Sequence, residues 1–483
     1  MIHAYQCNGY HIVLDIGSGA VHVTDPAAYE AIVRLDRGEG CAAVSAALAT
    51  GHGLPSAETD ELLADIEMLR RRGQLFAPEA WGEGADAVDY ASLAAAHRAK
   101  EPVVKALCLH VSHTCDLACR YCFAQAGRYH GPEALMSFGV GRQALDFLLA
   151  HAGTRRHLEV DFFGGEPLLN WDVVKRLVAY ARGREAESGK RFRFTLTTNG
   201  MRLDDEVTDF CNREMSNVVL SLDGRRETHD RLRRTPADAG SYDTVVPKFQ
   251  RFVERRRGGT YYMRGTFTHE NPDFTRDLLH MASLGFRQLS MEPVVAAPGD
   301  PLALSPADLG VILAEYERLA AEMARRQGTA EAFSFYHFNL DLAHGPCLYK
   351  RVTGCGAGTE YLAVTPTGDF YPCHQFVGDP AFRLGNVRDG LTNPALIADF
   401  RACTLYTRPT CRDCWARLYC SGGCCANAYH ASGSIRGVYE DGCTLFRKRI
   451  ECAIMLQAAA ARRNGDAPSP RGSAQDGKDG SSP

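Results

Sequence analysis

Apolar and polar residues follow two different periods along this chain, and the change of period divides it into segments. Between residues 11 and 24 they alternate on either side of a Gly-Ser-Gly turn, which predicts a β-hairpin. A helix capped by Asp25 follows, and Leu62 and Ile66 have the spacing of a second amphipathic helix. With the segment QLFAP as a returning strand, residues 1–80 are expected to form a winged-helix-like module.

Residues 104–334 repeat a strand followed by a helix. The strands are expected at KALCLHVS, HLEVDFFGG, FRFTLTTNG, VVLSLDG, YYMRGTFT and FRQLSMEPV, and stretches with helical spacing separate them. Strands that alternate with helices favour a parallel sheet, and a full eight-stranded barrel typically takes about 250 residues. The pattern therefore predicts an α/β fold with a partial (β/α)6 barrel that resembles a TIM barrel.

Three other segments lack these periods. Residues 81–103 are rich in Ala and Gly and are expected to be a linker. Residues 335–457 are expected to form a loop-rich, cysteine-rich domain. Residues 458–483 are mostly polar and are expected to be a disordered tail.

Composition and charge narrow the function classes. The net charge of −4 gives no basic field for nucleic acid and no polybasic segment for a membrane surface. No signal peptide and no apolar run of about 20 residues stands out, so we expect a cytoplasmic protein without membrane contact. The chain has 18 cysteines, and 11 of them lie between residues 347 and 452. Clustering of this kind in a reducing compartment indicates metal or redox sites rather than disulfides.

Cys115, Cys119 and Cys122 have a C-x3-C-x2-C spacing directly after the first predicted barrel strand. Active sites of such barrels lie at the carboxyl ends of the strands. Three thiolates leave a metal site one ligand short, and an open coordination position is typical of a catalytic metal site. The alternative is a structural zinc site completed by His110 or His113.

This cysteine motif, with Tyr121 before its last cysteine, resembles the signature of the radical S-adenosylmethionine (SAM) enzymes. The resemblance implies a [4Fe–4S] cluster whose fourth iron binds SAM, and a 5′-deoxyadenosyl radical that abstracts hydrogen. Cys115, Cys119 and Cys122 would then be the catalytic cluster ligands. The SAM contacts that it implies are Tyr121 in the motif itself and residues at the later strand ends: Gly164, Gly165 and Glu166, then Thr198 and Asn199, then Ser221 and Asp223, then Arg264 and Glu292. The alternatives are a helix-capping role for Glu166, a simple turn at Asn199 and a structural ion pair for Arg264.

The C-terminal cysteines have the pattern C-x12-G-x4-C from Cys355, followed by C-x2-C-x5-C-x3-C from Cys411 and a later cysteine. A zinc ribbon would use four ligands, and these cysteines exceed one zinc site. The pattern is similar to the SPASM extension of radical SAM enzymes, which implies two auxiliary [4Fe–4S] clusters. The distal cluster would be held by Cys411, Cys414, Cys420 and Cys443. The proximal cluster would be held by Cys355, Cys373 and Cys424, with either Cys347 or a substrate thiolate as the fourth ligand. Cys403, Cys425 and Cys452 fall outside the motif and are assigned to packing.

Longer stretches, such as LEVDFFGGEPLLN and CGAGTEYLAVTPTGDFYPCHQFVG, resemble the maturases of SCIFF peptides. These enzymes install thioether cross-links in a small, cysteine-rich ribosomal peptide. The resemblance implies that the N-terminal module is a RiPP recognition element, which binds the leader of the precursor as an added strand. A cysteine sulfur would join the carbon from which hydrogen is removed, and a flavodoxin or ferredoxin would supply electrons.

Three alternatives remain open. The first is a maturase that links cysteine to acidic side chains, and the second is a formylglycine-generating sulfatase activator. The third is a non-catalytic module in which metal centres scaffold peptide binding. The N-terminal module could also be a simple cap on the barrel.

Overall fold

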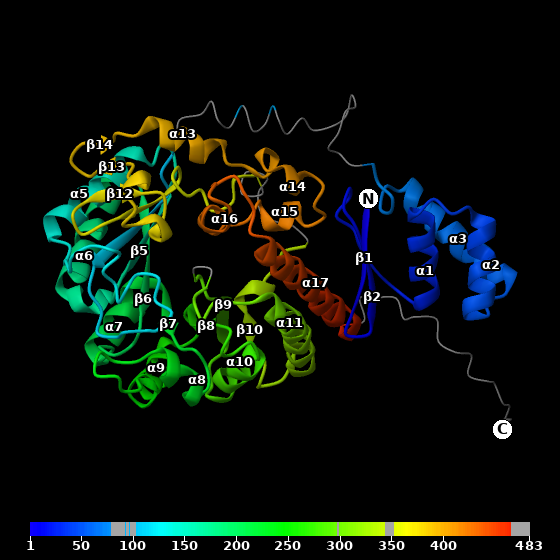
Figure 1. Cartoon of the computed structure of the whole chain (residues 1–483), viewed down its shortest axis with the longest axis horizontal. Coiled ribbons are helices and arrows are strands. Elements are labelled where there is room, and N and C mark those ends of the chain that lie inside the picture. Colours follow the sequence, from blue (N-terminus) through cyan, green and yellow to red (C-terminus); the bar gives the residue numbers. More distant parts are fainter. Residues whose placement is uncertain (79–91, 93–95, 97–102, 297–298, 343–351, 465–483) are drawn as a thin grey trace, which may run out of the picture.

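The computed structural model describes residues 1–78, 92, 96, 103–296, 299–342 and 352–464. An N-terminal module, a strand-and-helix barrel and a cysteine-rich C-terminal segment follow one another along the chain (Figure 1). The expected linker lies almost wholly outside the described residues, as does the expected tail from residue 465 onward.

The N-terminal module is a three-stranded antiparallel sheet in the order β1-β2-β3, followed by three helices. Its elements are β1 (Ile2–Cys7), β2 (Tyr10–Asp15), β3 (Val21–Thr24), α1 (Pro26–Asp36), α2 (Cys41–His52) and α3 (Ser56–Arg71). The predicted hairpin is present as β2 and β3, and Asp25 caps α1 as predicted, because its side chain accepts from the amide of Ala28. Strand β1 was not predicted.

The prediction of a returning strand at QLFAP is wrong. Leu75 is fully buried in the core that Val13, Ile32 and Ile66 form, so this segment packs as an apolar loop. The amide of Ala77 donates to the Asp15 carboxylate at 3.0 Å instead of to a neighbouring strand. A side-chain acceptor therefore replaces the expected strand pairing.

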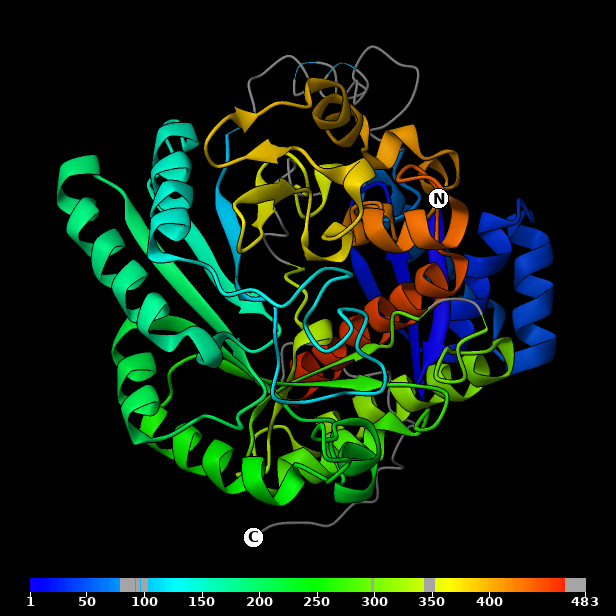
Figure 2. The same ribbon diagram turned by 60° about the vertical axis from the view of Figure 1, so that its left-hand side comes forward.

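The barrel is built on one sheet in the order β10-β9-β8-β7-β6-β5-β4-β11-β12-β13-β14. All six predicted strands are present and parallel, and a two-residue seventh, β10, follows them. They are β4 (Ala106–Ser112), β5 (His157–Gly164), β6 (Arg191–Thr198), β7 (Met215–Ser221), β8 (Tyr261–Phe267), β9 (Gln288–Pro293) and β10 (Ser334–Phe335). The curved sheet and its covering helices are clearest in Figure 2.

Helices cover the outer face of this sheet. They are α5 (Phe138–His151), α6 (Trp171–Ser188), α7 (Asp205–Glu214), α8 (Arg226–Leu232), α9 (Tyr242–Arg256), α10 (Phe274–Ser283) and α11 (Pro306–Arg326). Alternate strand residues such as Phe194, Leu220 and Leu289 are fully buried in the large core beneath them. The intervening residues form an inner face, which carries polar side chains such as Ser221 and Ser290.

The C-terminal segment continues the barrel sheet rather than forming a separate one. Its elements are β11 (Tyr361–Val364), β12 (Asp369–Tyr371), β13 (Gly385–Asn386), β14 (Gly390–Leu391), α13 (Pro394–Ala402), α14 (Pro409–Arg412), α15 (Arg417–Cys420), α16 (Cys425–Ser432) and α17 (Glu440–Arg463). Strand β11 pairs in parallel with β4, so the sheet crosses the boundary expected at residue 335. Helix α17 extends six residues beyond the expected end of the ordered domain at residue 457.

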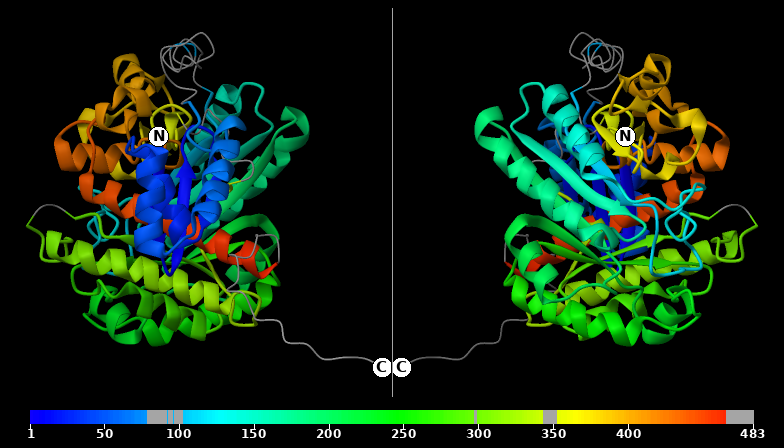
Figure 3. Two further views of the ribbon diagram at one scale, coloured as in Figure 1. Left: turned by 90° about the vertical axis from the view of Figure 1, so that its right-hand side faces the viewer. Right: turned by 90° about the vertical axis from the view of Figure 1, so that its left-hand side faces the viewer.

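Helix α17 lies between the N-terminal module and the barrel and packs along α11 (Figures 1 and 3). On its other side, the hydroxyl of Tyr5 donates to the carbonyl oxygen of Glu451 at 3.0 Å. His3 Nε2 lies 3.0 Å from the Glu451 carboxylate, and the His3 ring stacks on Trp415 with centroids 3.7 Å apart. Strand β1 therefore anchors the module on the C-terminal segment. In the part of the chain that the structure describes, no helix is both long and apolar enough to cross a bilayer.

Replacing His3 with Ala should loosen this anchor. The variant loses both the ring stack and the contact with Glu451, which together are worth about 1 kcal/mol. We expect faster amide hydrogen exchange in β1, measured by mass spectrometry, with unchanged exchange in β5 and β6. His52→Ala is the matched control, because His52 pairs with Glu30 inside the module. Equal exchange in β1 for the two variants would contradict the anchoring role.

Candidate functional site

The loop with Cys115, Cys119 and Cys122 starts at the carboxyl end of β4, as predicted from the sequence. Two of its amides donate to the segment after α8: Ala118 to the carbonyl oxygen of Arg234 at 2.7 Å, and Arg120 to that of Leu232 at 2.9 Å. The loop is therefore held at the mouth of the barrel by backbone hydrogen bonds.

Gly164 and Gly165 let the end of β5 pack directly under this loop. A Cβ atom on Gly164 would lie 2.2 Å from the carbonyl oxygen of Ser112, and one on Gly165 would lie 2.2 Å from that of Thr114. The amide of Glu166 donates to the same Thr114 oxygen at 2.9 Å. The close approach that these glycines permit is therefore to the cysteine loop.

Glu166 is fully buried, and both of its carboxylate oxygens accept hydrogen bonds from the protein. One oxygen accepts from the Leu168 amide at 3.0 Å and the Thr198 hydroxyl at 2.8 Å, and the other from the Asn199 amide at 2.8 Å. Glu166 thus caps the short helix η1 (Pro167–Asn170), which is the structural alternative considered for it. Burial raises its pKa to about 7.

Asn199, at the end of β6, holds the cysteine loop from the side. Its side-chain amide donates to Asp116 at 2.8 Å and lies 3.6 Å from the sulfur of Cys115. Arg202 binds the other oxygen of Asp116 at 3.0 Å. Asn199 also begins a turn, since its side-chain oxygen accepts from the Met201 amide. Asn199 therefore both positions the cysteine loop and stabilises the turn.

Tyr121 and Asp223 meet on the other side of the loop. The Tyr121 hydroxyl donates to Asp223 at 2.8 Å, and Arg233 binds the same carboxylate oxygen at 3.0 Å. The second oxygen of Asp223 accepts from the Thr266 amide at 2.9 Å. Asp223 is fully buried, so this carboxylate joins the cysteine loop to the ends of β7 and β8.

Ser221 and Arg264 are register neighbours on the inner face, with Ser290 next to Arg264 on β9. The Arg264 side chain is exposed and forms no ion pair with any residue that the structure describes. Glu292 instead binds Arg449 at 3.1 Å. Burial would raise the pKa of Glu292, but Arg449 and Arg264 lower it to about 2. Arg264 is thus a cation at the barrel mouth that remains available for an anionic group.

The zinc alternative requires ligands that meet at one point. His110 and His113 contact each other, with Nδ1 of His110 3.1 Å from Nε2 of His113, and both pack on Tyr129. Within the described ranges, no three His, Cys, Asp or Glu side chains are placed to share a single metal ion. Burial raises the pKa of Cys119 to about 12, so this thiol stays protonated unless a metal displaces the proton. The geometry of the described residues therefore does not favour a single zinc ion at this loop.

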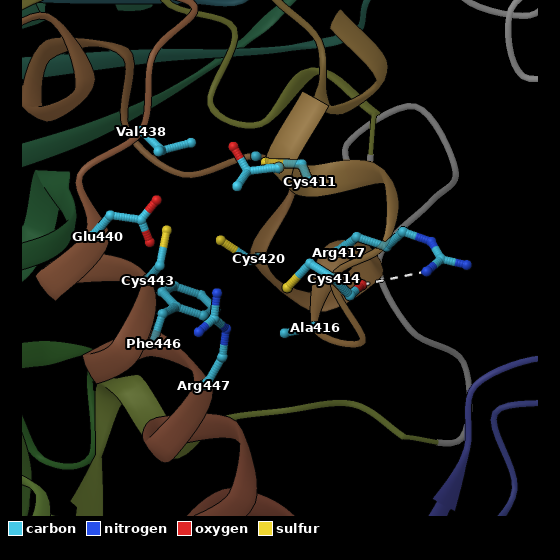
Figure 4. Close-up of a pocket in the computed structure, with 12 residues that line it drawn as sticks. Cys411, Cys414, Ala416, Arg417, Cys420, Val438, Glu440, Cys443, Phe446 and Arg447 are labelled. Atoms are coloured by element: carbon cyan, nitrogen blue, oxygen red, sulfur yellow. Dashed lines mark hydrogen bonds between the residues drawn. The ribbon is translucent and has the colours of Figure 1, made fainter. Parts of the chain in front are cut away.

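The four cysteines predicted for the distal cluster surround one cavity (Figure 4). In the figure the four sulfur atoms, of Cys411, Cys414, Cys420 and Cys443, point inward from three different stretches of chain. Burial raises the pKa of Cys420 to about 12, and the other three thiols raise it as well. Four thiols that converge on one cavity are the ligand set of a [4Fe–4S] cluster.

The cysteines predicted for the proximal cluster also lie together. Burial raises the pKa of Cys373, and the neighbouring Cys424 and Cys355 raise it further. Cys347, the candidate fourth ligand, lies outside the described residues. Phe123 and His374, which follow Cys122 and Cys373, have ring centroids 5.9 Å apart. The proximal site therefore adjoins the loop of the first site.

Sequence reasoning missed several residues that hold these sites. Arg233 lies within an arginine-rich stretch that is typical of a solvated helix end, so no signal distinguished it. Asp116 stands inside the cysteine motif, where any residue is allowed. Trp415 lies between Cys414 and Ala416, which both line the distal cavity. Its large side chain was the one feature of the sequence that could have marked it as a packing residue.

Comparison with known families agrees with this geometry. The model of the radical SAM superfamily matches residues 109–282, and that of the SPASM iron–sulfur cluster-binding domain matches residues 355–415. The chain is 21% identical to the radical SAM cyclopropyl synthase TigE of Paramaledivibacter caminithermalis, over 73% of this chain and 74% of that one. It is 24% identical to a cysteine-type anaerobic sulfatase-maturating enzyme of Clostridium perfringens, over 67% of this chain and 89% of the enzyme.

Solved structures show the same fold. Native anSMEcpe with bound AdoMet superposes with a TM-score of 0.62 at 20% identity, covering 75% of this chain and all of that one. Streptococcus suis SuiB bound to the precursor peptide SuiA superposes with a TM-score of 0.51 at 16% identity, covering 88% and 94%.

The family matches cover the barrel and the cysteine-rich segment separately: the first includes Cys115, Cys119 and Cys122, and the second includes Cys355, Cys373, Cys411 and Cys414. The cofactors are accordingly a [4Fe–4S] cluster with SAM in the barrel and auxiliary iron–sulfur clusters in the C-terminal segment. The chain has the α/β radical SAM fold with a SPASM iron–sulfur domain.

Proposed function

We propose that this chain is a radical SAM peptide maturase that installs cysteine thioether cross-links in a small, cysteine-rich ribosomal peptide. The observation that carries the proposal is the combination of an open three-cysteine site with a closed four-cysteine cavity in one chain. A peptide substrate is supported by the relatives, since SuiB is bound to a precursor peptide and anSMEcpe to the Kp18Cys peptide. The thioether product rests on the resemblance to the SCIFF-peptide maturases.

In this proposal Cys115, Cys119 and Cys122 hold the cluster at the barrel mouth. The cluster and SAM would supply a carbon radical that abstracts a hydrogen atom from the peptide. Asn199 and Asp116 keep Cys115 in place, and Tyr121 with Asp223 keeps the far end of the loop in place. The residues around the loop thus orient the ligands before any cofactor binds.

Arg264 is proposed to bind the carboxylate of SAM, since an exposed guanidinium on the inner face suits a carboxylate fork. Ser221 lies beside it and is proposed as a contact of the ribose. Glu166, Thr198 and Asp223 already accept or donate hydrogen bonds within the protein. Their proposed SAM contacts would use the lone pairs that remain on those oxygens.

The N-terminal module is proposed to bind the leader of the peptide along β3. This strand is the outer edge of the module's described sheet, and its residues are half-buried. An edge strand offers unpaired backbone groups that can take up an extended peptide. The anchor of His3 and Tyr5 on α17 would hold the bound leader at a constant distance from the barrel.

Replacing Cys115, Cys119 and Cys122 together with Ala should abolish SAM cleavage while the SPASM clusters remain. Iron analysis of the anaerobically purified variant should show the loss of one cluster. Cys41→Ala is the control, because Cys41 is exposed on the N-terminal module and should leave both iron content and cleavage unchanged. Reductive SAM cleavage by the triple variant at the wild-type rate would refute the assignment of the loop.

Cys420→Ala should separate the two kinds of site. Removing one of four ligands from the distal cavity should cost one cluster, but SAM cleavage at the barrel should persist. Cross-linking of the peptide should be lost if the distal cluster takes part in turnover. Full peptide modification by a variant that lacks the distal cluster would show that this cluster has only a structural role.

The function itself is tested by anaerobic co-expression with a small cysteine-rich peptide encoded beside this gene. Mass spectrometry should find two hydrogens lost per modified cysteine, resistance to thiol alkylation and no reversal by reductant. Fragmentation then names the acceptor residue: an acidic acceptor would favour the cysteine-to-acidic maturases. Oxidation of a single cysteine to formylglycine would favour the sulfatase-type activity. Absence of SAM cleavage would favour the non-catalytic module.

A further inference from the structure

Cys403 and Cys425 were assigned to packing from the sequence, but the structure places their sulfur atoms 3.6 Å apart. Cys403 ends α13 and is buried, whereas Cys425 begins α16 and is half-buried. Both cysteines, together with Cys355, line a small, partly open cavity. Two thiols in contact at the wall of a cavity can react with a reagent from solution, whereas a fully enclosed pair cannot.

Arg408 lies across both sulfurs. One of its terminal nitrogens, Nη2, donates to Cys403 at 3.2 Å and to Cys425 at 3.4 Å, and also to the carbonyl oxygen of Ile435 at 2.7 Å. The other, Nη1, donates to the carbonyl oxygen of Gly422. No described carboxylate forms an ion pair with Arg408, although only 3% of the residue is exposed.

A buried guanidinium is costly unless an anion accompanies it. The groups that accept hydrogen bonds from Arg408 are two carbonyl oxygens and the two sulfurs, and the Cys411 thiol also interacts with its charge, so the anions that can accompany Arg408 are cysteine thiolates. Arg408 is placed to stabilise a thiolate at either sulfur, and the Cys403 sulfur also lies 3.1 Å from the carbonyl oxygen of Ile435. The arrangement keeps one sulfur reactive beside a second that can resolve it.

We propose that Cys403 and Cys425 form a redox-active thiol pair that closes to a disulfide when a small-molecule disulfide reaches the cavity. The Cys403 thiolate attacks the disulfide and releases one thiolate of the reagent. Cys425 then loses its proton to that thiolate and attacks the mixed disulfide, which releases the second thiolate. The pair is oxidised by two electrons, and the reagent is reduced to two thiol equivalents.

Closure would act on the neighbouring cluster site. Cys425 directly follows Cys424, a proposed ligand of the proximal cluster, and it shares the cavity with Cys355. A disulfide needs its sulfurs about 2.05 Å apart, so closure must draw the start of α16 toward the end of α13. This modification site depends on the sulfur pair and Arg408 and is independent of the peptide product.

The test uses the full-length, cluster-loaded protein under anaerobic conditions with oxidised glutathione. Free thiols are then alkylated, and peptide mapping with fragmentation locates any disulfide. We expect a Cys403–Cys425 bond that dithiothreitol reverses. Arg408→Gln should slow its formation about tenfold, because the thiolate loses its counter-charge. Arg412→Gln is the matched control, since Arg412 is exposed on the same stretch and donates to a carbonyl oxygen instead.

Two results would overturn the proposal. The first is full alkylation of both cysteines under conditions that convert the exposed Cys41 to its glutathione adduct. The second is that the Cys403→Ser and Cys425→Ser variants each lack the iron of one cluster, while both cysteines of the wild type are protected from alkylation. The two cysteines would then be metal ligands. Retention of wild-type iron content in both variants, with loss of the disulfide, is the expected outcome.

Discussion

Glu166 is a buried carboxylate whose two oxygens join the ends of β5 and β6 beneath the cysteine loop. A carboxylate in this position is tolerated because three donors surround it, and the same donors come from the segments that support the loop. Asn199 extends the network to Asp116 and Cys115. The open site is therefore built on fixed hydrogen bonds between strand ends rather than on the cysteines themselves.

The three cysteine sites form a continuous arrangement in space. The first site contacts the proximal one through the rings of Phe123 and His374. The proximal and distal sites share the stretch from Cys420 to Cys424, which supplies a ligand to each in the proposed assignment. Helix α17 carries Cys443 near its start, and farther along it packs against both β1 and α11. A movement of the N-terminal module would thus be transmitted through α17 to the distal cavity.

Much of this could be predicted from the sequence because strand alternation and cysteine spacing are local signals. All six barrel strands were found this way, and the four distal cysteines do surround one cavity. Contacts between distant residues left no such signal. No local pattern marks Arg233 or Arg408, yet Arg233 is half-buried against Asp223 and Arg408 is buried against Cys403 and Cys425. The two glycines at the end of β5 permit a close approach of another segment, but only the structure identifies the cysteine loop as that segment.

The central claim is that the three-cysteine loop holds a cluster with one iron open to SAM. Electron paramagnetic resonance of the reduced protein, recorded with and without SAM, tests it most directly. The account predicts that SAM alters the signal of one cluster in the wild type and has no effect in the Cys115/Cys119/Cys122 triple Ala variant. A wild-type spectrum indifferent to SAM, or zinc in place of iron at that loop, would contradict it.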